Sequence, residues 1–131
     1  MIIDSSAVVA VVRDEPDAAA LTEAMLRAGR LRMSAGTYLE TSIVIEARRD
    51  PVTVRVVDTI LSRFGVEIEA FTPEQAEIAR AAYRDFGKGS GHPAQLNFGD
   101  CFAYALAKAT GEPLLYKGDD FGHTDIRSAL E

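Results

Sequence analysis

The chain has 131 residues, of which 47% are hydrophobic, and its formal net charge is −6. This length and composition predict one domain over residues 1–131 with a single core. The acidic balance argues against a protein that binds nucleic acid mainly through a basic surface, although bound cations can neutralise acids gathered in a pocket. No apolar stretch approaches the roughly 20 residues that cross a bilayer, and no signal-type segment begins the sequence. We therefore expect a cytoplasmic protein without a membrane partner.

Apolar runs and helix-capping residues divide the first half of the chain into short strands and helices. The apolar run at 1–3 stops at Asp4 and predicts a buried strand. Pro16 suits the first position of a helix that Asp14 or Glu15 would cap, and Ser34 is the expected cap of a later helix. In this half we expect strands at 1–3 and 31–33, and helices at 7–12, 16–28, 35–49 and 52–63.

The second half continues the alternation. Residues 66–71 predict a strand, and a helix should follow from Pro73 and end before the glycine-dense segment 87–93, which is a candidate mobile loop. Asn97 can cap a helix over 98–110 that Gly111 closes, and a buried strand is expected at 113–116. Strands that alternate with helices predict an α/β fold whose parallel sheet is covered on both faces.

Four carboxylates stand where an apolar run ends or a helix begins: Asp4, Glu40, Asp100 and Asp119. A parallel sheet gathers the carboxyl ends of its strands at one edge, so residues remote in sequence can converge there. Three of the four also have an ordinary structural interpretation. Asp4 and Asp100 can complement a helix amino terminus, and Asp119 can belong to a turn, as its neighbour Asp120 does.

Glu40 is the acid that local structure explains least well. It shares one side of its predicted helix with apolar residues that we expect to face the protein interior. Glu46 lies on the same helix among polar neighbours and is interpreted as a solvent-exposed charge. The contrast favours a functional role for Glu40. The residues that share its side are Gly36, Ile43, Val44 and Ala47.

Carboxylates gathered in one pocket repel one another, so such a cluster usually indicates a bound cation. Mg²⁺ and Mn²⁺ are hard cations that prefer carboxylate oxygens and retain several waters. One or two such ions can activate water and stabilise the leaving oxygen in phosphodiester hydrolysis. The four acids therefore predict a phosphoryl hydrolase that uses Mg²⁺ or Mn²⁺ as its cofactor.

Four segments that carry these acids also share a recognisable order and spacing. They are Ile2–Ser6, Ser34–Ser42, Asn97–Asp100 and Leu114–Phe121. Together they resemble the PIN-domain pattern, and in particular that of VapC-type toxins, over nearly the whole chain. The resemblance implies a PIN-like, Rossmann-like fold, which is a three-layer α/β/α sandwich with a central, mostly parallel sheet.

The same resemblance implies a function and partners. A VapC-type toxin is a metal-dependent endoribonuclease that acts on RNA, usually forms a homodimer, and is held inactive by its cognate antitoxin. By this resemblance, Asp4, Glu40, Asp100 and Asp119 would be the catalytic residues and the metal ligands.

Three further residues invite specific predictions. Ser6 is a candidate auxiliary residue that would bind a water in the site. The family often places Ser or Thr two residues before the fourth acid, whereas this chain has Lys117, which can contact a phosphate, pair with the acids or lie in solvent. Cys101, the single cysteine, is expected to be packed and unreactive.

Two other interpretations of the acids stay open at this point. A receiver-like or phosphatase-like α/β domain would phosphorylate an aspartate and use a lysine after its last strand, here Lys117, to sense it. A catalytically silent PIN-like module would instead use the carboxylates to bind an arginine of a partner protein.

Overall fold

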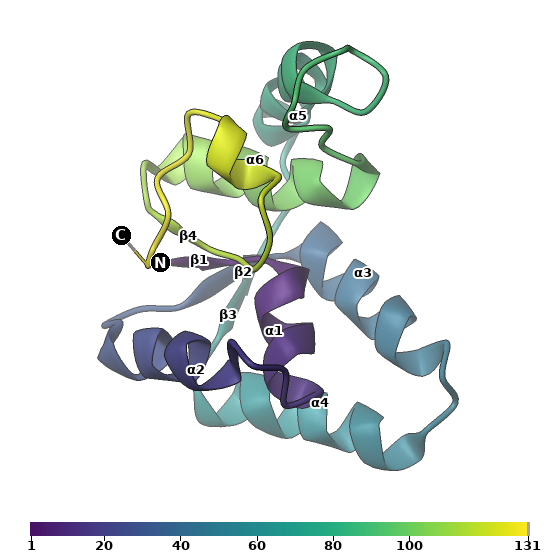
Figure 1. Ribbon diagram of the computed structural model, residues 1–131. Coiled ribbons are helices and arrows are strands. Elements are labelled where there is room, and N and C mark those ends of the chain that lie inside the picture. The colour runs from purple at the N-terminus through teal and green to yellow at the C-terminus, as the bar shows by residue number, and fades with distance from the viewer. Residues whose placement is uncertain (131) are drawn as a thin grey trace.

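A four-stranded, all-parallel sheet forms the centre of the computed structural model, which describes residues 1–130 (Figure 1). Its strands lie in the order β3-β2-β1-β4, and each pairs in parallel with its neighbour. The predicted α/β class with a parallel sheet is confirmed. The strands are β1 (Ile2–Ile3), β2 (Arg32–Ser34), β3 (Glu67–Glu69) and β4 (Leu114–Leu115).

Helices cover both faces of the sheet. In Figure 1, α5 and α6 lie on one face and α1, α2 and α4 on the other, while α3 extends from the edge where the strands end. Among residues 1–130, no helix is long and apolar enough to cross a bilayer. The helices are α1 (Ser5–Val12), α2 (Ala18–Arg27), α3 (Ala35–Glu46), α4 (Pro51–Arg63), α5 (Pro73–Phe86) and α6 (Phe98–Thr110), with a short 3-10 helix, η1 (Phe121–His123).

Two apolar cores lie on opposite faces of the sheet because successive side chains of a strand point in opposite directions. Ile2 and Leu114 pack with α6, whereas Ile3 and Leu115 pack with α1, α2 and α4. All four side chains are fully buried. Both faces of β1 and β4 are thus apolar, and the first position that tolerates charge on β1 is its carboxyl end.

The predicted caps that start and end the helices near that edge are present. The Ser34 hydroxyl accepts a hydrogen bond from the Gly36 N–H (3.2 Å) and starts α3. Asn97 accepts one from the Asp100 N–H (2.9 Å) and starts α6. Gly111 ends α6 in the left-handed conformation (φ 71°), which favours glycine. The Ser34 and Asn97 caps therefore fix where α3 and α6 begin, and these two helices carry Glu40 and Asp100.

The predicted start of the second helix is wrong. Asp14 has a positive φ of 52°, and a tight turn follows in which the Ala18 N–H donates to the Glu15 carbonyl (2.9 Å). Pro16 lies inside this turn, and α2 begins two residues later with Asp17 as its N-cap. The backbone reverses between α1 and α2, so the proline serves the turn and not the first helical position. The first helix also begins earlier than predicted, at Ser5.

Backbone hydrogen bonds close the glycine-dense segment 87–93 at its base. The Lys88 N–H donates to the Leu96 carbonyl (2.8 Å), and the Leu96 N–H donates to that of Phe86 (2.9 Å). His92 packs edge-on against Phe86 at 4.9 Å between ring centroids. The segment therefore has defined anchors, and its mobility stays a prediction.

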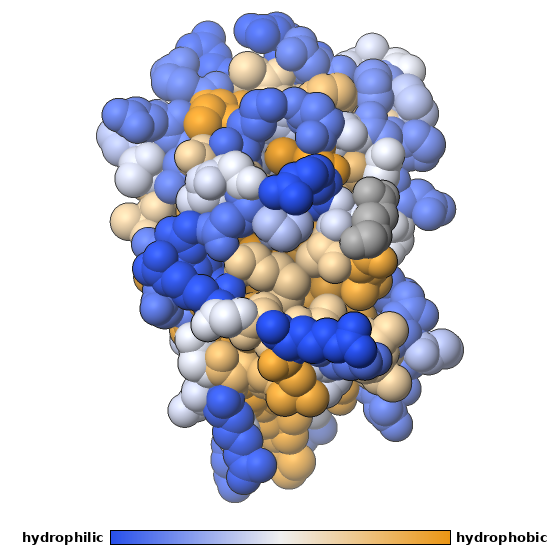
Figure 2. All heavy atoms as spheres, turned by 90° about the vertical axis from the view of Figure 1, so that its left-hand side faces the viewer, coloured by the Kyte–Doolittle hydropathy of each residue, from blue (hydrophilic) through white to orange (hydrophobic). Residues whose placement is uncertain are grey.

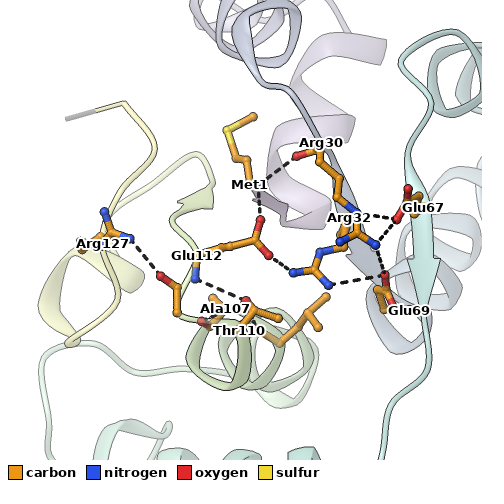
Figure 3. Close-up of polar contacts among 11 residues, drawn as sticks. Met1, Arg30, Arg32, Glu67, Glu69, Ala107, Thr110, Glu112 and Arg127 are labelled. Atoms are coloured by element: carbon orange, nitrogen blue, oxygen red, sulfur yellow. Dashed lines mark hydrogen bonds and ion pairs between the residues drawn. The ribbon is translucent and has the colours of Figure 1, made fainter.

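A network of ion pairs joins the amino ends of β1, β2 and β4 and reaches the last residue of β3 (Figure 3). Glu112, which precedes β4, accepts hydrogen bonds from the Met1 ammonium group and from Arg32 on β2. Arg32 also pairs with Glu69 on β3 (3.6 Å). The network joins three strands, so the positions of β1 and β2 relative to one another are fixed at the edge opposite their carboxyl ends.

Candidate functional site

Three of the four predicted acids meet where the strands end. Asp4 follows β1, Glu40 lies on α3, which follows β2, and Asp100 lies in the first turn of α6. The negative charge of Glu40 raises the pKa of Asp4, and both Asp4 and Glu40 raise that of Asp100. The three carboxylates are therefore close enough to repel one another.

Asp4 is the most enclosed of these acids, with only 2% of its surface exposed. Its Oδ2 accepts hydrogen bonds from the backbone N–H (3.0 Å) and the hydroxyl (2.6 Å) of Ser6. Within residues 1–130, no hydrogen-bond donor contacts Oδ1, which is buried. Burial and the nearby Glu40 carboxylate raise the pKa of Asp4 to about 6, against the opposing effect of the Ser6 hydrogen bonds. A buried oxygen without a donor is costly unless a cation binds it.

Glu40 lies between the amino ends of two helices. Its Oε1 accepts a hydrogen bond from the Ser5 hydroxyl (2.8 Å) in the first turn of α1. Its Oε2 lies against Gly99 in the first turn of α6, where a Cβ atom would come within 1.5 Å of it. The carboxylate is thus held on both sides. Helix amino termini carry partial positive charge, which favours an anionic group at this place.

Asp100 is held by the start of its own helix. Its Oδ2 accepts a hydrogen bond from the Asn97 N–H (3.0 Å), while the Asn97 side chain accepts one from the Asp100 N–H, which completes a capping box. Burial raises its pKa to about 7, and the charges of Asp4, Asp120 and Glu40 add to the effect. The capping interpretation of this residue is confirmed, and its role in an acidic pocket stays a prediction.

The fourth predicted acid, Asp119, does not join this cluster in the same way. Its side chain is exposed, and its carbonyl accepts a hydrogen bond from the Gly122 N–H (3.1 Å) in the turn that leads into η1. Its neighbour Asp120 is the residue whose charge acts on Asp100. The interpretation of Asp120 as a turn residue alone is therefore incomplete. Gly-Asp-Asp is ordinary turn composition, so the sequence contained no signal that could distinguish the role of Asp119 from that of Asp120.

Ser6 does not need a water to satisfy its hydroxyl. The hydroxyl donates to Asp4 and accepts a hydrogen bond from the Lys117 backbone N–H (2.9 Å). It therefore ties the Asp4 carboxylate to the segment that follows β4. Its role in this structure is to hold Asp4 in one orientation.

Comparison with known proteins places the chain in a family. A family model described as PIN domain matches residues 1–127. The chain belongs to the PIN-domain family. It is 53% identical over 131 residues to Ribonuclease VapC28 of Mycobacterium tuberculosis, an alignment that covers 100% of this chain and 98% of that protein.

Two solved structures share the PIN fold with this chain. One is Mycobacterium tuberculosis VapC20, described as a Sarcin-Ricin loop cleaving toxin, with a TM-score of 0.72 and 14% identity over 95% of both chains. The other is a toxin-antitoxin complex from Klebsiella pneumoniae, with a TM-score of 0.68 and 16% identity over 92% of this chain and 88% of that one. At this level of identity, the structural likeness supports the fold.

The side chain of Lys117 turns away from the acids. Its Nζ pairs with Glu15 Oε1 at 2.6 Å, beyond the carboxyl end of α1, whereas Asp4 caps the amino end of the same helix. Of the three interpretations of Lys117, pairing with the acid cluster is wrong in this structure. A receiver-like mechanism needs a lysine directed toward the aspartates, so this geometry argues against it.

Cys101 is buried in the first turns of α6 and donates a weak hydrogen bond to the Asn97 carbonyl (3.4 Å). Burial and the adjacent Asp100 charge raise the pKa of the thiol to about 11. Because the thiolate is the reactive form, the thiol is unreactive at neutral pH, which agrees with the packed cysteine that the sequence predicts.

One prediction about the surroundings of Glu40 is wrong. Ile43 and Val44 were expected to face the interior, but Ile43 is 58% exposed and Val44 is exposed as well. The residues of α3 that turn inward are Thr37, Thr41 and Ile45. Apolar and polar residues are spread around the whole circumference of this helix, and two of the three inward residues are threonines, so periodicity could not identify the inner side.

A separate hollow of about 590 Å³ lies at the edge that carries the termini. Figure 2 looks onto this side of the molecule, where charged residues border an apolar area. Met1 and Pro113 line the hollow at the amino ends of β1 and β4. In open α/β sheets, ligands bind at the carboxyl ends of the strands. The acids and the hollow lie at opposite edges, so the candidate site is the acid cluster.

Proposed function

We propose that this chain is a metal-dependent endoribonuclease, the toxin of a VapC-type toxin–antitoxin system. The observation that carries the proposal is the convergence of Asp4, Glu40 and Asp100 at the carboxyl edge of the sheet, in a chain more than half identical over its full length to a named ribonuclease. The acting unit is a single PIN-like domain of residues 1–131. We propose that it acts on RNA in the cytoplasm.

Mg²⁺ or Mn²⁺ is the cofactor that suits these residues. Within residues 1–130, no three His, Cys, Asp or Glu side chains stand close enough together to enclose an ion as they are. The donor chemistry nevertheless fits, because Asp4 Oδ1 is a buried oxygen without a donor and the neighbouring groups are carboxylates. Carboxylates gathered in one pocket repel one another, and a bound cation would remove that repulsion.

Each of the three acids has a distinct, supported position. Ser6 orients Asp4 so that Oδ2 is occupied and Oδ1 is left as a ligand atom, while Ser5 and Gly99 hold Glu40 from two sides. The start of α6 fixes Asp100. When bound, the metal ion lowers the pKa of a water and offsets charge on the phosphodiester. The protein holds the carboxylates in place. The Ser5 and Ser6 hydroxyl groups fix the orientations of Glu40 and Asp4 before an ion and RNA bind.

The fourth acid comes from the turn after β4. Our proposal keeps Asp119 as the fourth ligand and assigns Asp120 a supporting charge near Asp100. Asp119 is exposed and free to turn, so it can approach when an ion is present. Replacing each residue by Asn separates the two roles, because loss of the ligand weakens Mn²⁺ binding more than loss of a neighbouring charge. If Asp120→Asn weakens Mn²⁺ binding more, the assignments are reversed.

The proposed partners follow from the family. The Klebsiella pneumoniae relative is described as a toxin-antitoxin complex, and we propose that a cognate antitoxin protein likewise inhibits this chain. We also propose that the toxin is a homodimer. Co-expression with the gene that neighbours it should relieve growth arrest caused by the toxin alone, and an unrelieved arrest would contradict the antitoxin assignment.

RNA cleavage with and without Mn²⁺ tests the proposed activity. Purified protein should cleave total cellular RNA when Mn²⁺ is added, and Asp4→Asn should abolish cleavage while circular dichroism shows a folded protein. Full activity of the folded variant would refute the assignment.

Calorimetry separates the enzyme from a silent binding module. An enzyme site should bind Mn²⁺ and lose that binding in Asp100→Asn. A surface that only binds an arginine of a partner should show no Mn²⁺ site in either protein.

A further inference from the structure

Three cations from different parts of the chain act on one carboxylate, that of Glu15. Lys117 Nζ pairs with Glu15 Oε1 at 2.6 Å, and the hydrogen bond and charge of Lys117 lower the pKa of Glu15. The charges of Arg13, which ends α1, and Arg48, which follows α3, lower it further. We call Arg13, Arg48 and Lys117 the basic cluster.

A tight reversal of the backbone after α1 sets the position of Glu15. Asp14 has a positive φ of 52°, a conformation that few residues other than glycine adopt. The Glu15 N–H donates to the Ala10 carbonyl (2.9 Å), and the Asp14 N–H donates to that of Val11 (3.2 Å). The chain thus turns back along α1, and Glu15 meets a lysine 102 positions away.

Helix ends explain only part of the basic cluster. Cations favour the carboxyl end of a helix, which accounts for Arg13 after α1 and for Arg48 after α3. Lys117 follows β4 and reaches its partner beyond the end of α1. The cluster is therefore assembled by the tertiary fold and not by one helix end.

Cations exceed acids at this place. Asp17 is the other acid whose charge acts on Lys117. Among residues 1–130, Arg13 and Arg48 have no carboxylate partner at ion-pair distance. The side chains of Lys117 and Glu15 are 34% and 29% exposed, so an anion from solvent can reach the pair. On a chain of net charge −6, such a cluster gives a polyanion a place to approach.

The basic cluster is tied to the acid cluster through Lys117. Its backbone N–H donates to the Ser6 hydroxyl (2.9 Å), which donates to Asp4. Asp4 caps α1 at one end and Arg13 at the other, and a helix of 8 residues is about 12 Å long. Stacked nucleotides advance roughly 3.4 Å each, so a few nucleotides of one strand can span the two clusters.

A phosphodiester suits the basic cluster better than a carboxylate does. Both are oxyanions with one negative charge. Lysine binds phosphate as a point charge, and arginine can donate to two phosphate oxygens at once. Within residues 1–130, the Glu15 side chain accepts a hydrogen bond from Lys117 alone, so a bound phosphate would satisfy more of the donors than Glu15 does.

We propose that the basic cluster binds a phosphate of the RNA substrate a few nucleotides from the bond that is cut, and that Glu15 occupies this position in the free protein. The inference deepens the proposed function, on which it rests for RNA as the substrate. RNA exchanges the Lys117–Glu15 pair for a Lys117–phosphate pair, and the two arginines gain a partner. Lys117 is then a residue that binds the substrate and not a catalytic one.

RNA binding in EDTA, where no metal supports cleavage, tests the cations. In about 50 mM salt, a labelled single-stranded RNA of about 20 nucleotides should bind the native protein, and Lys117→Gln and Arg48→Gln should each weaken binding about fivefold or more. For Lys117→Gln, the slope of log affinity against log salt should fall by about 0.7, the value for one phosphate contact on a single strand.

Arg27→Gln is the matched control for these variants. Arg27 also pairs with a carboxylate, that of Glu23 at 2.6 Å, but both residues lie on α2. This variant should bind the RNA as the native protein does. A native protein that does not bind, or equal affinities in Lys117→Gln and Arg27→Gln, would overturn the proposal.

Removal of the Glu15 charge tests its place in the phosphate position. Glu15→Gln should strengthen RNA binding about fivefold, because the phosphate no longer competes with a carboxylate for Lys117. Glu23→Gln makes the same chemical change in the ion pair on α2 and should leave the affinity unchanged. Equal affinities in these two variants would contradict the role of Glu15.

Steady-state cleavage with Mn²⁺ separates binding from chemistry. Lys117→Gln should raise KM about fivefold and change kcat by less than about twofold, because the remote phosphate is held equally in the substrate and the transition state. A loss confined to kcat would refute the assignment of Lys117 as a binding residue.

Failure of this inference and failure of the proposed function give different results. Affinity in EDTA does not depend on cleavage, so RNA binding that needs the basic cluster, in a protein without ribonuclease activity, would refute only the function. An active ribonuclease whose Lys117→Gln and Arg48→Gln variants bind RNA with native affinity would refute only the phosphate site.

Discussion

At the residue scale, two adjacent serines each support a different acid. Ser5 donates to Glu40 and Ser6 to Asp4, so one turn of backbone aligns carboxylates that are 36 positions apart in the chain. The sequence predicted Asp4 and Asp100 because each stands at an element end, and it predicted Glu40 from the apolar residues that share one side of its helix. It could not reveal that Lys117 pairs with Glu15, since nothing local links residues 102 positions apart.

Gly99 offers a test of how closely Glu40 must be held. In Gly99→Ala, the added Cβ would displace the flexible end of Glu40, which lies 1.5 Å from that position. Folding should be retained, because alanine suits a helix. Mn²⁺ affinity measured by calorimetry should fall by roughly 10- to 100-fold, the usual effect of disturbing a supporting group.

Gly29→Ala is the control for that substitution. Nothing lies within 4 Å of a Cβ atom at Gly29, so this variant should bind Mn²⁺ as the native protein does. Native affinity in Gly99→Ala would show that Glu40 is not a ligand or that its position is not critical.

At the element scale, helix starts deliver the acids to the edge of the sheet. The caps were predictable because Ser34 and Asn97 bond to N–H groups only two and three residues away. The orientation of α3 was not predictable, because apolar and polar residues are spread around its whole circumference and tertiary contacts with α1 and α6 select its inner side. The same ambiguity led to the wrong burial of Ile43.

Asn97→Ala should weaken both α6 and the site. Loss of the cap should lower the free energy of unfolding by about 1 kcal/mol, and the loosened first turn should weaken Mn²⁺ binding through Asp100. Asp50→Ala is the matched control, since Asp50 caps α4 by accepting from the Val52 N–H (3.0 Å). That variant should lose similar stability in urea unfolding and keep Mn²⁺ affinity. Equal Mn²⁺ affinity in both variants would contradict the role of the α6 start.

At the scale of the whole molecule, the parallel sheet explains why a chain of net charge −6 gathers acids at one edge. The apolar faces of β1 and β4 leave only their carboxyl ends for charge, and the helices that follow β1 and β2 begin there. Figure 3 shows the opposite edge closed by ion pairs, in which the Met1 ammonium group, Arg30 and Arg32 each have a carboxylate partner. Within residues 1–130, Asp4, Glu40 and Asp100 at the other edge have no such ion-pair partner, and this asymmetry supports our proposal that the functional site lies there.

Stability should depend on pH because these acids are unpaired. Folding raises the pKa of Asp4 to about 6 from its ordinary value of 3.8, so its protonated form favours the folded state below pH 4, and that stability is lost as the pH rises through 6. For a group this buried, the effect is on the order of 3 kcal/mol. Asp100, with a pKa of about 7, acts in the same direction at slightly higher pH.

Thermal unfolding in EDTA measures this effect. Between about pH 4 and 7, the melting temperature of the native protein should fall relative to that of Asp4→Asn, which cannot ionise at this position. Added Mn²⁺ should stabilise the native protein increasingly as the pH rises, because the ionised carboxylates bind it. A native protein whose melting temperature stays parallel to that of Asp4→Asn across this range would contradict the unpaired, buried carboxylate.

The central claim is that one acid of α3 acts in RNA cleavage while another on the same helix does not. Glu40→Gln and Glu46→Gln make the same chemical change on one helix, at the acid cluster and on the exposed side. The decisive measurement is the single-turnover rate of RNA cleavage at saturating Mn²⁺ for both folded variants. We predict a loss of about 100-fold or more for Glu40→Gln and a native rate for Glu46→Gln. Equal rates in the two variants would contradict the account.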